Sequence, residues 1–218
     1  GQLHVLDNIS FDIKKGEFVC VVGPTGCGKT TFLNLLTKIH EPTSGELRID
    51  GELADPKKHN LAFVFQEASS YPWLTVEKNV SFSLRMQKKQ DKELVEHMLK
   101  MVGLEDFRKD YPHQLSGGMA QRVALVRSLI NHPDILLLDE PLGALDAFTR
   151  MNMQDEILRI WKETGMTAIM VTHDVDEAVY LSDKVVVMTP RPGRITGTLD
   201  IQLSRPRARS SEDFLQYR

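Results

Sequence analysis

One stretch of this chain constrains its fold more than any other. Residues 23–30 read Gly-Pro-Thr-Gly-Cys-Gly-Lys-Thr, which fits the pattern Gly-x-x-x-x-Gly-Lys-[Ser/Thr]. The apolar run 17–22 before it has the length of a strand, and residues 31–38 after it have the pattern of an amphipathic helix. A strand, this loop and a helix in that order predict a site for nucleotide phosphates. The same setting argues against a glycine-rich turn that merely precedes a lysine.

The residue types of this loop suit phosphate for physical reasons. Glycines let the backbone turn tightly, so that successive N–H groups can point inward at phosphate oxygens. The helix that follows adds the positive end of its dipole at the same place. We expect Lys29 to reach the β- and γ-phosphates and the Thr30 hydroxyl to hold Mg²⁺.

Composition narrows the class of protein. With 218 residues, of which 41% are hydrophobic and 26% charged, the chain can bury a full core. Its net charge of -3 leaves no basic footprint for nucleic acid, and its apolar runs are too short to span a bilayer. Neither Cys20 nor Cys27 resembles half of a disulfide or metal pair, which favours a reduced cytosolic compartment. Because the chain begins at Gly1, we expect it to be truncated or tagged there.

The first fifty residues predict a small antiparallel β layer against a nucleotide-binding core. Residues 9–13 alternate apolar and polar types, the period of a half-buried strand. Residues 14–17 form a turn containing Gly16, and residues 46–51 read as a short strand that ends in an Asp-Gly turn.

Two features follow the apolar strand predicted at 61–65. Gln66 ends that strand, where it is either a surface cap or an amide aimed at Mg²⁺ or the attacking water. The cluster Tyr71-Pro72-Trp73-Leu74 places large apolar side chains in a loop. It is either a local plug or a contact surface for a partner.

A helical region and a second possible anion site come next. Residues 75–104 have helical spacing, interrupted by a solvated turn at 88–92. Ser116 is a good N-cap for the following helix, and Gly117 and Gly118 leave bare backbone N–H groups at its start. This site has no lysine of its own, so alone it is weak evidence for a ligand.

The run 134–141 indicates a catalytic edge. Four aliphatic residues at 135–138 predict a strand buried on both faces, and two carboxylates follow it beside the phosphate loop. Asp139 can hold Mg²⁺ through water, and Glu140 can take a proton from an attacking water. Another buried strand, at 167–172, delivers His173 to the same edge. The last clear strand is 183–188, and the arginines of the tail are too sparse for a nucleic-acid patch.

The ordered motifs resemble the ATP-binding cassette (ABC) ATPases over essentially the whole chain. The resemblance implies an α/β P-loop NTPase core with a mainly parallel sheet, an N-terminal antiparallel β layer and an inserted α-helical subdomain. It implies one domain, 1–218, with the catalytic core in 1–66 and 135–218 and the helical subdomain in 67–134.

The resemblance also assigns roles. Asp139 and Glu140 match the Walker B motif and its catalytic glutamate, Gln66 the Q-loop, and His173 the switch histidine that contacts the γ-phosphate. The resemblance therefore implies four catalytic residues, Glu140, His173, Gln66 and Lys29. It implies that Mg²⁺ is bound by Thr30, Gln66 and Asp139. The nucleotide-binding Walker A residues are Gly23, Pro24, Thr25, Gly26, Cys27, Gly28, Lys29, Thr30 and Thr31.

Residues 115–119 match the LSGGQ motif, which in this family completes the ATP site of the opposite subunit. Met119 replaces its glutamine, but Ser116, Gly117 and Gly118 are present, and Asp146 matches the D-loop aspartate. The family also stacks adenine on an aromatic residue upstream of the first strand, and none precedes Phe11. Either that residue lies before Gly1 or adenine is held differently.

Within the family, residues 71–76 and 189–195 look like those of importers for nitrate, sulfonates and taurine, a subgroup that includes importers of pyrimidine-type vitamin precursors. The resemblance implies an ATPase subunit that dimerises head to tail around two Mg-ATP at the cytoplasmic face of the membrane. Its partners would be a membrane permease and, indirectly, a periplasmic or surface solute-binding protein, with no nucleic acid. The alternatives are a soluble ABC protein acting on DNA or ribosomes and a non-catalytic nucleotide-gated module.

Overall fold

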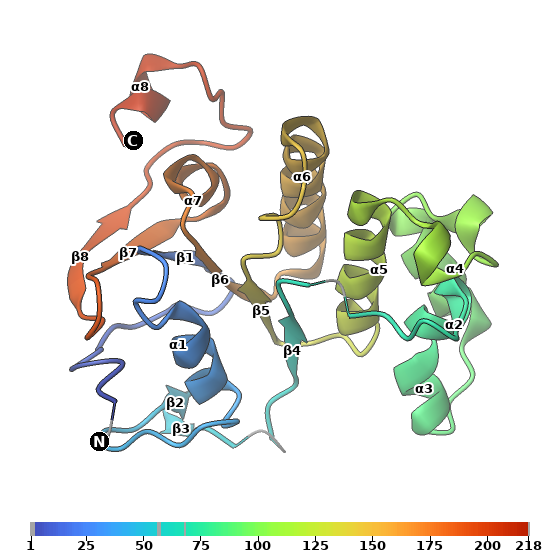
Figure 1. Cartoon of the computed structure of the whole chain (residues 1–218), viewed down its shortest axis with the longest axis horizontal. Helices are drawn as coiled ribbons and strands as arrows, with labels where there is room; N and C mark the ends of the chain where they lie inside the picture. Colours follow the sequence, from blue (N-terminus) through green and yellow to red (C-terminus); the bar gives the residue numbers. More distant parts are fainter. Residues whose placement is uncertain (1–2, 56–57, 68, 218) are drawn as a thin grey trace.

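The computed structural model describes residues 3–55, 58–67 and 69–217, and its centre is a six-stranded sheet with helices on both faces (Figure 1). The strand order is β4-β5-β6-β1-β7-β8. The first five are mutually parallel: β4 (Leu61–Val64), β5 (Ile135–Asp139), β6 (Thr167–Thr172), β1 (Phe18–Val22) and β7 (Lys184–Met188). The edge strand β8 (Ile195–Asp200) runs antiparallel to β7. A mainly parallel sheet, as predicted, is thus confirmed.

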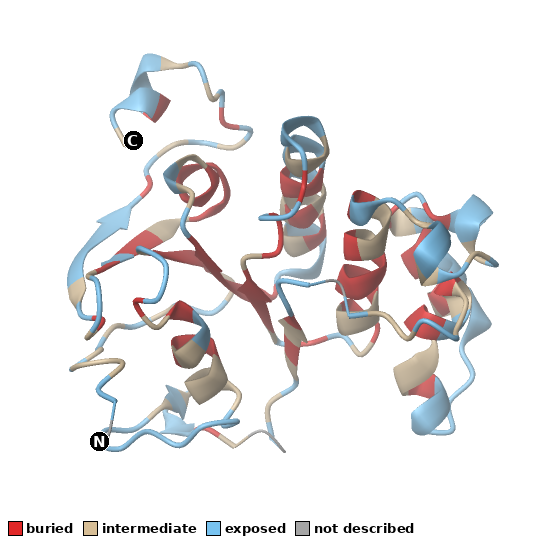
Figure 2. Ribbon diagram, viewed as in Figure 1, coloured by how far each residue is buried: buried red, intermediate tan, exposed pale blue. Residues whose placement is uncertain are grey.

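The sheet is buried on both faces because its central strands are apolar throughout. All five residues of β1 and all six of β6 are buried, and these strands form the red centre of Figure 2. Phe18 and Cys20 pack with α6 (Ala147–Thr164) and α7 (Val175–Leu181), whereas Val19 and Val21 pack with α1 (Lys29–Leu36). Each strand therefore contributes alternate side chains to two separate cores.

A cluster of helices lies between β4 and β5 in the chain and beside the sheet in space (Figure 1). Its core residues, Val80, Leu99 and Val126 among them, belong to the same hydrophobic cluster as Leu136 of β5. The division into units 1–66 with 135–218 and 67–134 stays a prediction. The elements of the cluster are α2 (Val76–Val80), α3 (Phe82–Met86), α4 (Lys92–Met101), the 3₁₀ turns η1 (Glu105–Phe107) and η2 (Pro112–Gln114), and α5 (Gly117–Leu129).

The strand predicted at 9–13 is wrong. Its alternate residues do face inward: Ile9, Phe11 and Ile13 pack on the core around α1, and the Phe11 ring lies 5.6 Å from that of Phe32. However, the segment pairs with no strand among the described residues, so the alternation reports one-sided burial without backbone pairing. The described antiparallel layer is the short hairpin of β2 (Arg48–Ile49) and β3 (Glu52–Leu53), turned through Asp50 and Gly51 as predicted.

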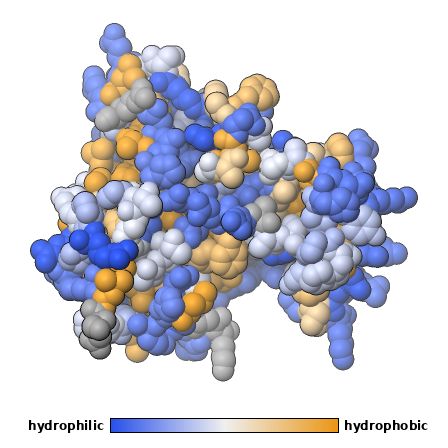
Figure 3. Space-filling model, viewed as in Figure 1, coloured by the Kyte–Doolittle hydropathy of each residue, from blue (hydrophilic) through white to orange (hydrophobic). Residues whose placement is uncertain are grey.

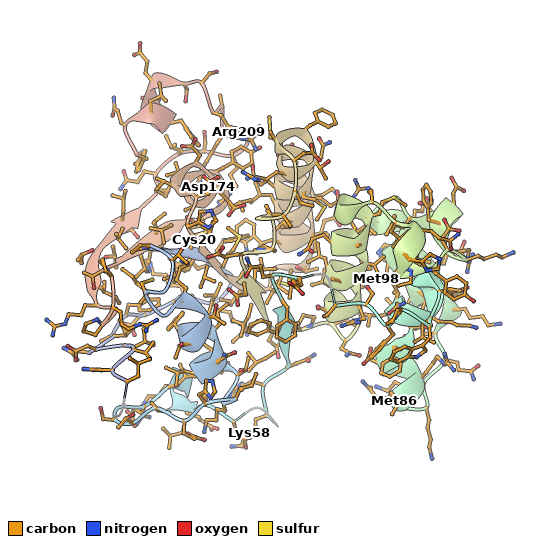
Figure 4. The ribbon with its side chains drawn as sticks, in the orientation of Figure 1. Cys20, Lys58, Met86, Met98, Asp174 and Arg209 are labelled. Carbon is orange, nitrogen blue, oxygen red and sulfur yellow. The ribbon has the colours of Figure 1, made fainter. Side chains whose placement is uncertain are left out.

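The tail after β8 folds back on α6 and α7 and ends in α8 (Glu212–Leu215). Arg207 is buried, and its guanidinium donates hydrogen bonds to the carbonyls of Val179, Tyr180 and Ser182 at the end of α7. Desolvation lowers the pKa of Arg207 to about 10. The guanidinium carbon of Arg209, a residue labelled in Figure 4, lies 3.5 Å from the centroid of the Tyr180 ring. Arg207 therefore caps the C-terminal end of α7, and both arginines connect the tail to the helices beneath it.

The surface is mixed in character. On the face seen in Figure 3, hydrophilic residues predominate and apolar residues form scattered patches. Over the described part of the chain, no helix combines the length and the apolar character needed to cross a bilayer.

Candidate nucleotide site

The loop between β1 and α1 forms the floor of the site. Its residues Pro24 to Cys27 make a turn in which the Cys27 N–H donates to the Pro24 carbonyl at 3.2 Å, and Gly26 has a φ of 79°. Gly28 is the N-cap of α1, with no side-chain hydrogen bond to the helix start. Because Gly28 has no side chain, it accepts no hydrogen bond from the first N–H groups of α1. These N–H groups can therefore bind an anion.

Two glycines of this loop are also required by close packing. A Cβ on Gly28 would lie 2.6 Å from Leu6 Cδ2, and the residue has a φ of 111°. A Cβ on Gly23 would lie 2.9 Å from Cys27 Sγ and 3.1 Å from the Met188 carbonyl oxygen. The loop is thus pressed between the N-terminal segment and the end of β7, which fixes its shape.

Lys29 lies at the centre of the site, with 5% of its side chain exposed. Its Nζ donates to the carbonyls of Gly23 at 2.9 Å and Pro24 at 3.3 Å, and lies 3.3 Å from Glu140 Oε1. The ammonium group is held inside the loop by neutral carbonyls and one carboxylate, where an entering phosphate would compete for it.

Glu140 joins Lys29 to His173. It follows β5 with a φ of 41°, an unfavourable value for a residue other than glycine, and its N–H donates to the Val171 carbonyl at 3.0 Å. Its Oε2 lies 3.0 Å from His173 Nδ1. Strain of this kind, on the order of 1–3 kcal/mol, persists where the surroundings fix the backbone, and it is concentrated at active sites.

Asp139 and Thr30 form a second pair of oxygen groups. The Thr30 hydroxyl donates to Asp139 Oδ1 at 3.2 Å. Burial raises the pKa of Asp139, and the charge of Glu140 adds to this, while the Thr30 hydrogen bond and Lys29 oppose it. Among the described residues, no three His, Cys, Asp or Glu side chains gather as a metal site. An Asp–Thr pair beside a phosphate loop fits Mg²⁺, which takes few protein ligands and completes its shell with water and phosphate.

The structure brings together Lys29, Thr30, Asp139, Glu140 and His173, as the sequence predicts. The predicted phosphate-loop residues Gly23 and Pro24 also contact this group through Lys29. Among the described residues, no hydrogen bond or ion pair joins the group to the five predicted site residues outside the loop: Gln66, Ser116, Gly117, Gly118 and Asp146. Gln66 is exposed just beyond the end of β4. The others lie at helix starts or the loop before α6: Ser116, Gly117, Gly118 and Asp146.

Ser116 and Asp146 are both N-caps. The Ser116 hydroxyl accepts from the Met119 N–H at 3.3 Å at the start of α5, as predicted. Asp146 accepts from the N–H groups of Phe148 and Thr149 at 3.1 and 3.0 Å, and hydrogen bonding by Thr149 lowers its pKa. A Cβ on Gly118 would lie 2.4 Å from Thr149 Cγ2, so α5 and α6 meet closely at this glycine.

Two arginines near the site were missed. Arg191, in the loop after β7, donates to the Gly26 carbonyl, a contact between residues 165 positions apart. Arg150 of α6 donates to the Leu145 carbonyl at 3.0 Å and lies 3.5 Å from Asp174. Asp174, labelled in Figure 4, follows His173 and is the N-cap of α7. The sequence of residues 189–195 indicates only a resemblance to one subgroup of importers, and nothing local to either arginine predicts its contact.

Comparison with known proteins finds a matching family model and similar relatives. The family model described as "ABC transporter" matches residues 6–143. The "Aliphatic sulfonates import ATP-binding protein SsuB" of Bacillus cereus (strain ZK / E33L) is 45% identical over 218 residues, 100% of this chain and 87% of that protein. The "Taurine import ATP-binding protein TauB" of Pelagibacter ubique (strain HTCC1062) is 50% identical over 196 residues, 88% of this chain and 74% of that protein.

A solved structure is similar over nearly its whole length. It is the dimeric post-hydrolysis state of the ATP-binding cassette MJ0796 bound to ADP and Pi. The TM-score is 0.78 and the identity 32%, and the match covers 92% of each chain. The similarity therefore extends over the sheet and both of its helical faces.

Proposed function

This chain belongs to the ABC transporter family, because a family model matches residues 6–143 and an import ATP-binding protein is similar over all 218 residues. We propose that the chain powers the uptake of small sulfonates. It is an ATPase that uses ATP and Mg²⁺. The observation that carries the substrate class is the identity of 45% to SsuB, named for the import of aliphatic sulfonates, and of 50% to TauB, named for the import of taurine. The names of these two relatives do not include nitrate, the other predicted solute.

The proposed chemistry follows from the five grouped residues. Lys29 leaves Glu140 and the loop carbonyls to neutralise the β- and γ-phosphates. Glu140 then has a free carboxylate oxygen, orients a water and takes its proton as the water oxygen attacks the γ-phosphorus and the bond to ADP breaks. His173 keeps Glu140 in place and can donate to the γ-phosphate. Bound Mg²⁺, held through Thr30 and Asp139, supplies positive charge to the phosphates.

The remaining site residues are proposed to act on the nucleotide of a second subunit. Ser116, Gly117, Gly118 and Asp146 make no described contact with Lys29, and the first three open α5 with N–H groups suited to an anion. A head-to-tail dimer would bring this helix start to the partner's γ-phosphate. Gln66, exposed at the end of β4, would join the Mg²⁺ site only as that dimer closes.

The permease is proposed to dock on the helical subdomain, 67–134, at the cytoplasmic face of the membrane, with the solute-binding protein acting only through it.

The sequence leaves two interpretations of the loop at 71–74, a local plug and a contact surface for a partner, and each describes part of the loop. Tyr71 is a plug: Asn79 bonds both its N–H and its carbonyl, and its ring lies 4.4 Å from that of Phe82. Trp73 is 71% exposed and is the proposed contact.

The test is growth on a sulfonate. The chain is expressed in a bacterium that lacks its own sulfonate-import ATPase but keeps the permease and binding protein, with taurine or an alkanesulfonate as the only sulfur source. We expect cells with the wild-type chain to grow and cells with Lys29→Ala not to grow. Both strains should grow on sulfate. Growth restored on nitrate as the only nitrogen source, in the matching strain, but not on sulfonates would contradict the substrate class.

A further inference from the structure

The loop between β7 and β8, residues 189–194, forms hydrogen bonds with the phosphate loop through Arg191. Arg191 donates two hydrogen bonds to the Gly26 carbonyl, from Nε at 3.2 Å and from Nη2 at 3.1 Å. A forked guanidinium that holds one carbonyl with two N–H groups limits the carbonyl's direction more than a single bond would. The grip falls on the turn that precedes Gly28 and Lys29.

This contact fixes one peptide plane of the phosphate loop. The Gly26 C=O and the Cys27 N–H belong to the same planar unit and point in opposite directions. Arg191 holds the C=O end, and the Pro24 carbonyl holds the N–H end at 3.2 Å. Gly26 has a φ of 79°, which glycine reaches easily and also leaves easily. Without Arg191, the hydrogen bond from the Cys27 N–H to the Pro24 carbonyl is the one that this peptide would keep among the described residues.

The loop that carries Arg191 is itself anchored. The Thr189 N–H donates to the Arg194 carbonyl, and the Arg194 N–H to the Thr189 hydroxyl, both at 2.9 Å. Gly193 exchanges backbone hydrogen bonds with Val5 and Asp7 of the N-terminal segment. A Cβ on Gly193 would lie 2.3 Å from the Cys27 carbonyl oxygen, so the β7–β8 loop also touches the next carbonyl of the phosphate loop.

We propose that Arg191 is a positioning residue for nucleotide binding. By holding the Gly26–Cys27 peptide, it keeps the phosphate loop in the shape whose N–H groups receive phosphate, and it does so before the nucleotide arrives. Preorganisation of this kind raises affinity because less conformational freedom is lost on binding. The inference rests on the proposed phosphate site and assigns Arg191 no part in the hydrolytic step.

The test measures binding and turnover separately. For Arg191→Ala we expect the Kd for MgADP, by isothermal titration, and the KM for MgATP to rise about tenfold, the usual worth of a charged hydrogen bond. The kcat should stay within about twofold. Arg191→Lys, which can donate to the carbonyl but not from a fork, should be intermediate. Amide hydrogen exchange at residues 26–28 should accelerate in Arg191→Ala while exchange in β1 does not change.

Arg194→Ala is the matched control, since Arg194 lies in the same loop and pairs with Asp7 rather than with the phosphate loop. Its Kd should equal that of the wild type. A Kd within twofold of wild type in folded Arg191→Ala would overturn the inference, as would a fall in kcat with unchanged KM. If Arg191→Ala does not fold, the Kd of Arg191→Lys decides. If wild type and Lys29→Ala bind MgADP equally well, the phosphate site itself fails, which is a different result.

Discussion

The carboxylate of Glu140 lies 3.0 Å from the imidazole of His173, from Oε2 to Nδ1, and the two residues come from neighbouring strands. They follow β5 and β6, which are parallel and pair Asp139 with Val171. Adjacent parallel strands end at the same edge of the sheet, so the residues that follow them meet there. His173 can therefore hold the carboxylate of Glu140, the proposed general base, in one orientation.

Glu140→Gln is predicted to bind ATP and fail to hydrolyse it. The amide keeps the size of the carboxylate but cannot accept a proton from water, so kcat should fall roughly 10²–10⁴-fold. ATP should then accumulate on the protein and hold a dimer, seen by gel filtration with MgATP. Glu163→Gln, which removes only an exposed partner of Arg159 on α6, is the control and should turn over normally. Parental kcat in Glu140→Gln would remove Glu140 from its role.

Asp139→Asn is predicted to stabilise the nucleotide-free protein while weakening Mg²⁺ binding. The pKa of Asp139 is raised in the folded chain. Such an acid favours folding below its unfolded pKa, and this contribution is lost as the pH rises through the folded pKa. At pH 7 the ionised group therefore lowers the free energy of unfolding. We expect Asn to raise Tm by about 1–4 °C at pH 7, with the gain shrinking toward about pH 4.

Asp146→Asn is the control for Asp139→Asn, because the pKa of Asp146 is shifted in the opposite direction. The pKa of Asp146 is lowered by its hydrogen bonds at the start of α6, so its stabilising contribution is present above its unfolded pKa and is lost on acidification. Asp146→Asn should therefore give no rise in Tm at pH 7. Equal Tm changes in the two variants, by differential scanning fluorimetry without nucleotide, would contradict the assigned environments.

The two glycines of α5 are predicted to differ. Gly118→Ala should lose about 1–3 kcal/mol of stability because its Cβ would meet Thr149 Cγ2 at 2.4 Å. Thr149→Ser removes that methyl group and keeps the hydroxyl, so the double variant should recover its Tm. Gly117→Ala places its Cβ 3.8 Å from Leu145, an ordinary contact, and should fold normally. Loss of Tm in Gly117→Ala but not in Gly118→Ala would show the α5–α6 contact to be misassigned.

Trp73→Ala is predicted to leave the isolated ATPase nearly intact and to weaken assembly with the permease, because Trp73 is exposed. Tyr71→Ala provides the contrast. It removes a ring packed on Phe82 and under the Arg127 guanidinium, so it should lower Tm. Co-purification with the permease and a thermal melt separate the two effects. Undiminished co-purification of Trp73→Ala would place the contact elsewhere.

The sequence predicts the grouped site well for a physical reason. Aliphatic runs mark β1, β5 and β6 as buried parallel strands. Asp139 is the last residue of β5, Glu140 and His173 directly follow β5 and β6, and Lys29 opens α1 after the loop that follows β1. Strand order is a different matter, because pairing between β1 and β6 joins residues about 150 positions apart, and no local pattern encodes it.

The failures have equally specific causes. The alternation of apolar and polar residues at 9–13 indicates which side chains face inward, but the segment pairs with no strand in the part of the chain that the structure describes. The edge strand β8 was missed because five of its six residues are exposed and it carries no apolar run. The grip of Arg191 on Gly26 spans 165 residues. Contacts of that kind depend on the assembled fold, which single-sequence patterns do not contain.

Mixing two inactive variants tests whether each ATP lies between two subunits. Lys29→Ala damages the phosphate loop, and Ser116→Arg places a bulky side chain at the start of α5. If each ATP lies between Lys29 of one subunit and Ser116 of the other, either homodimer has two damaged sites, but a mixed dimer has one site with both lesions and one with neither. ATP-dependent dimerisation, measured by analytical ultracentrifugation, should therefore return on mixing. No return, with both variants folded and shown to exchange subunits, would contradict the head-to-tail dimer.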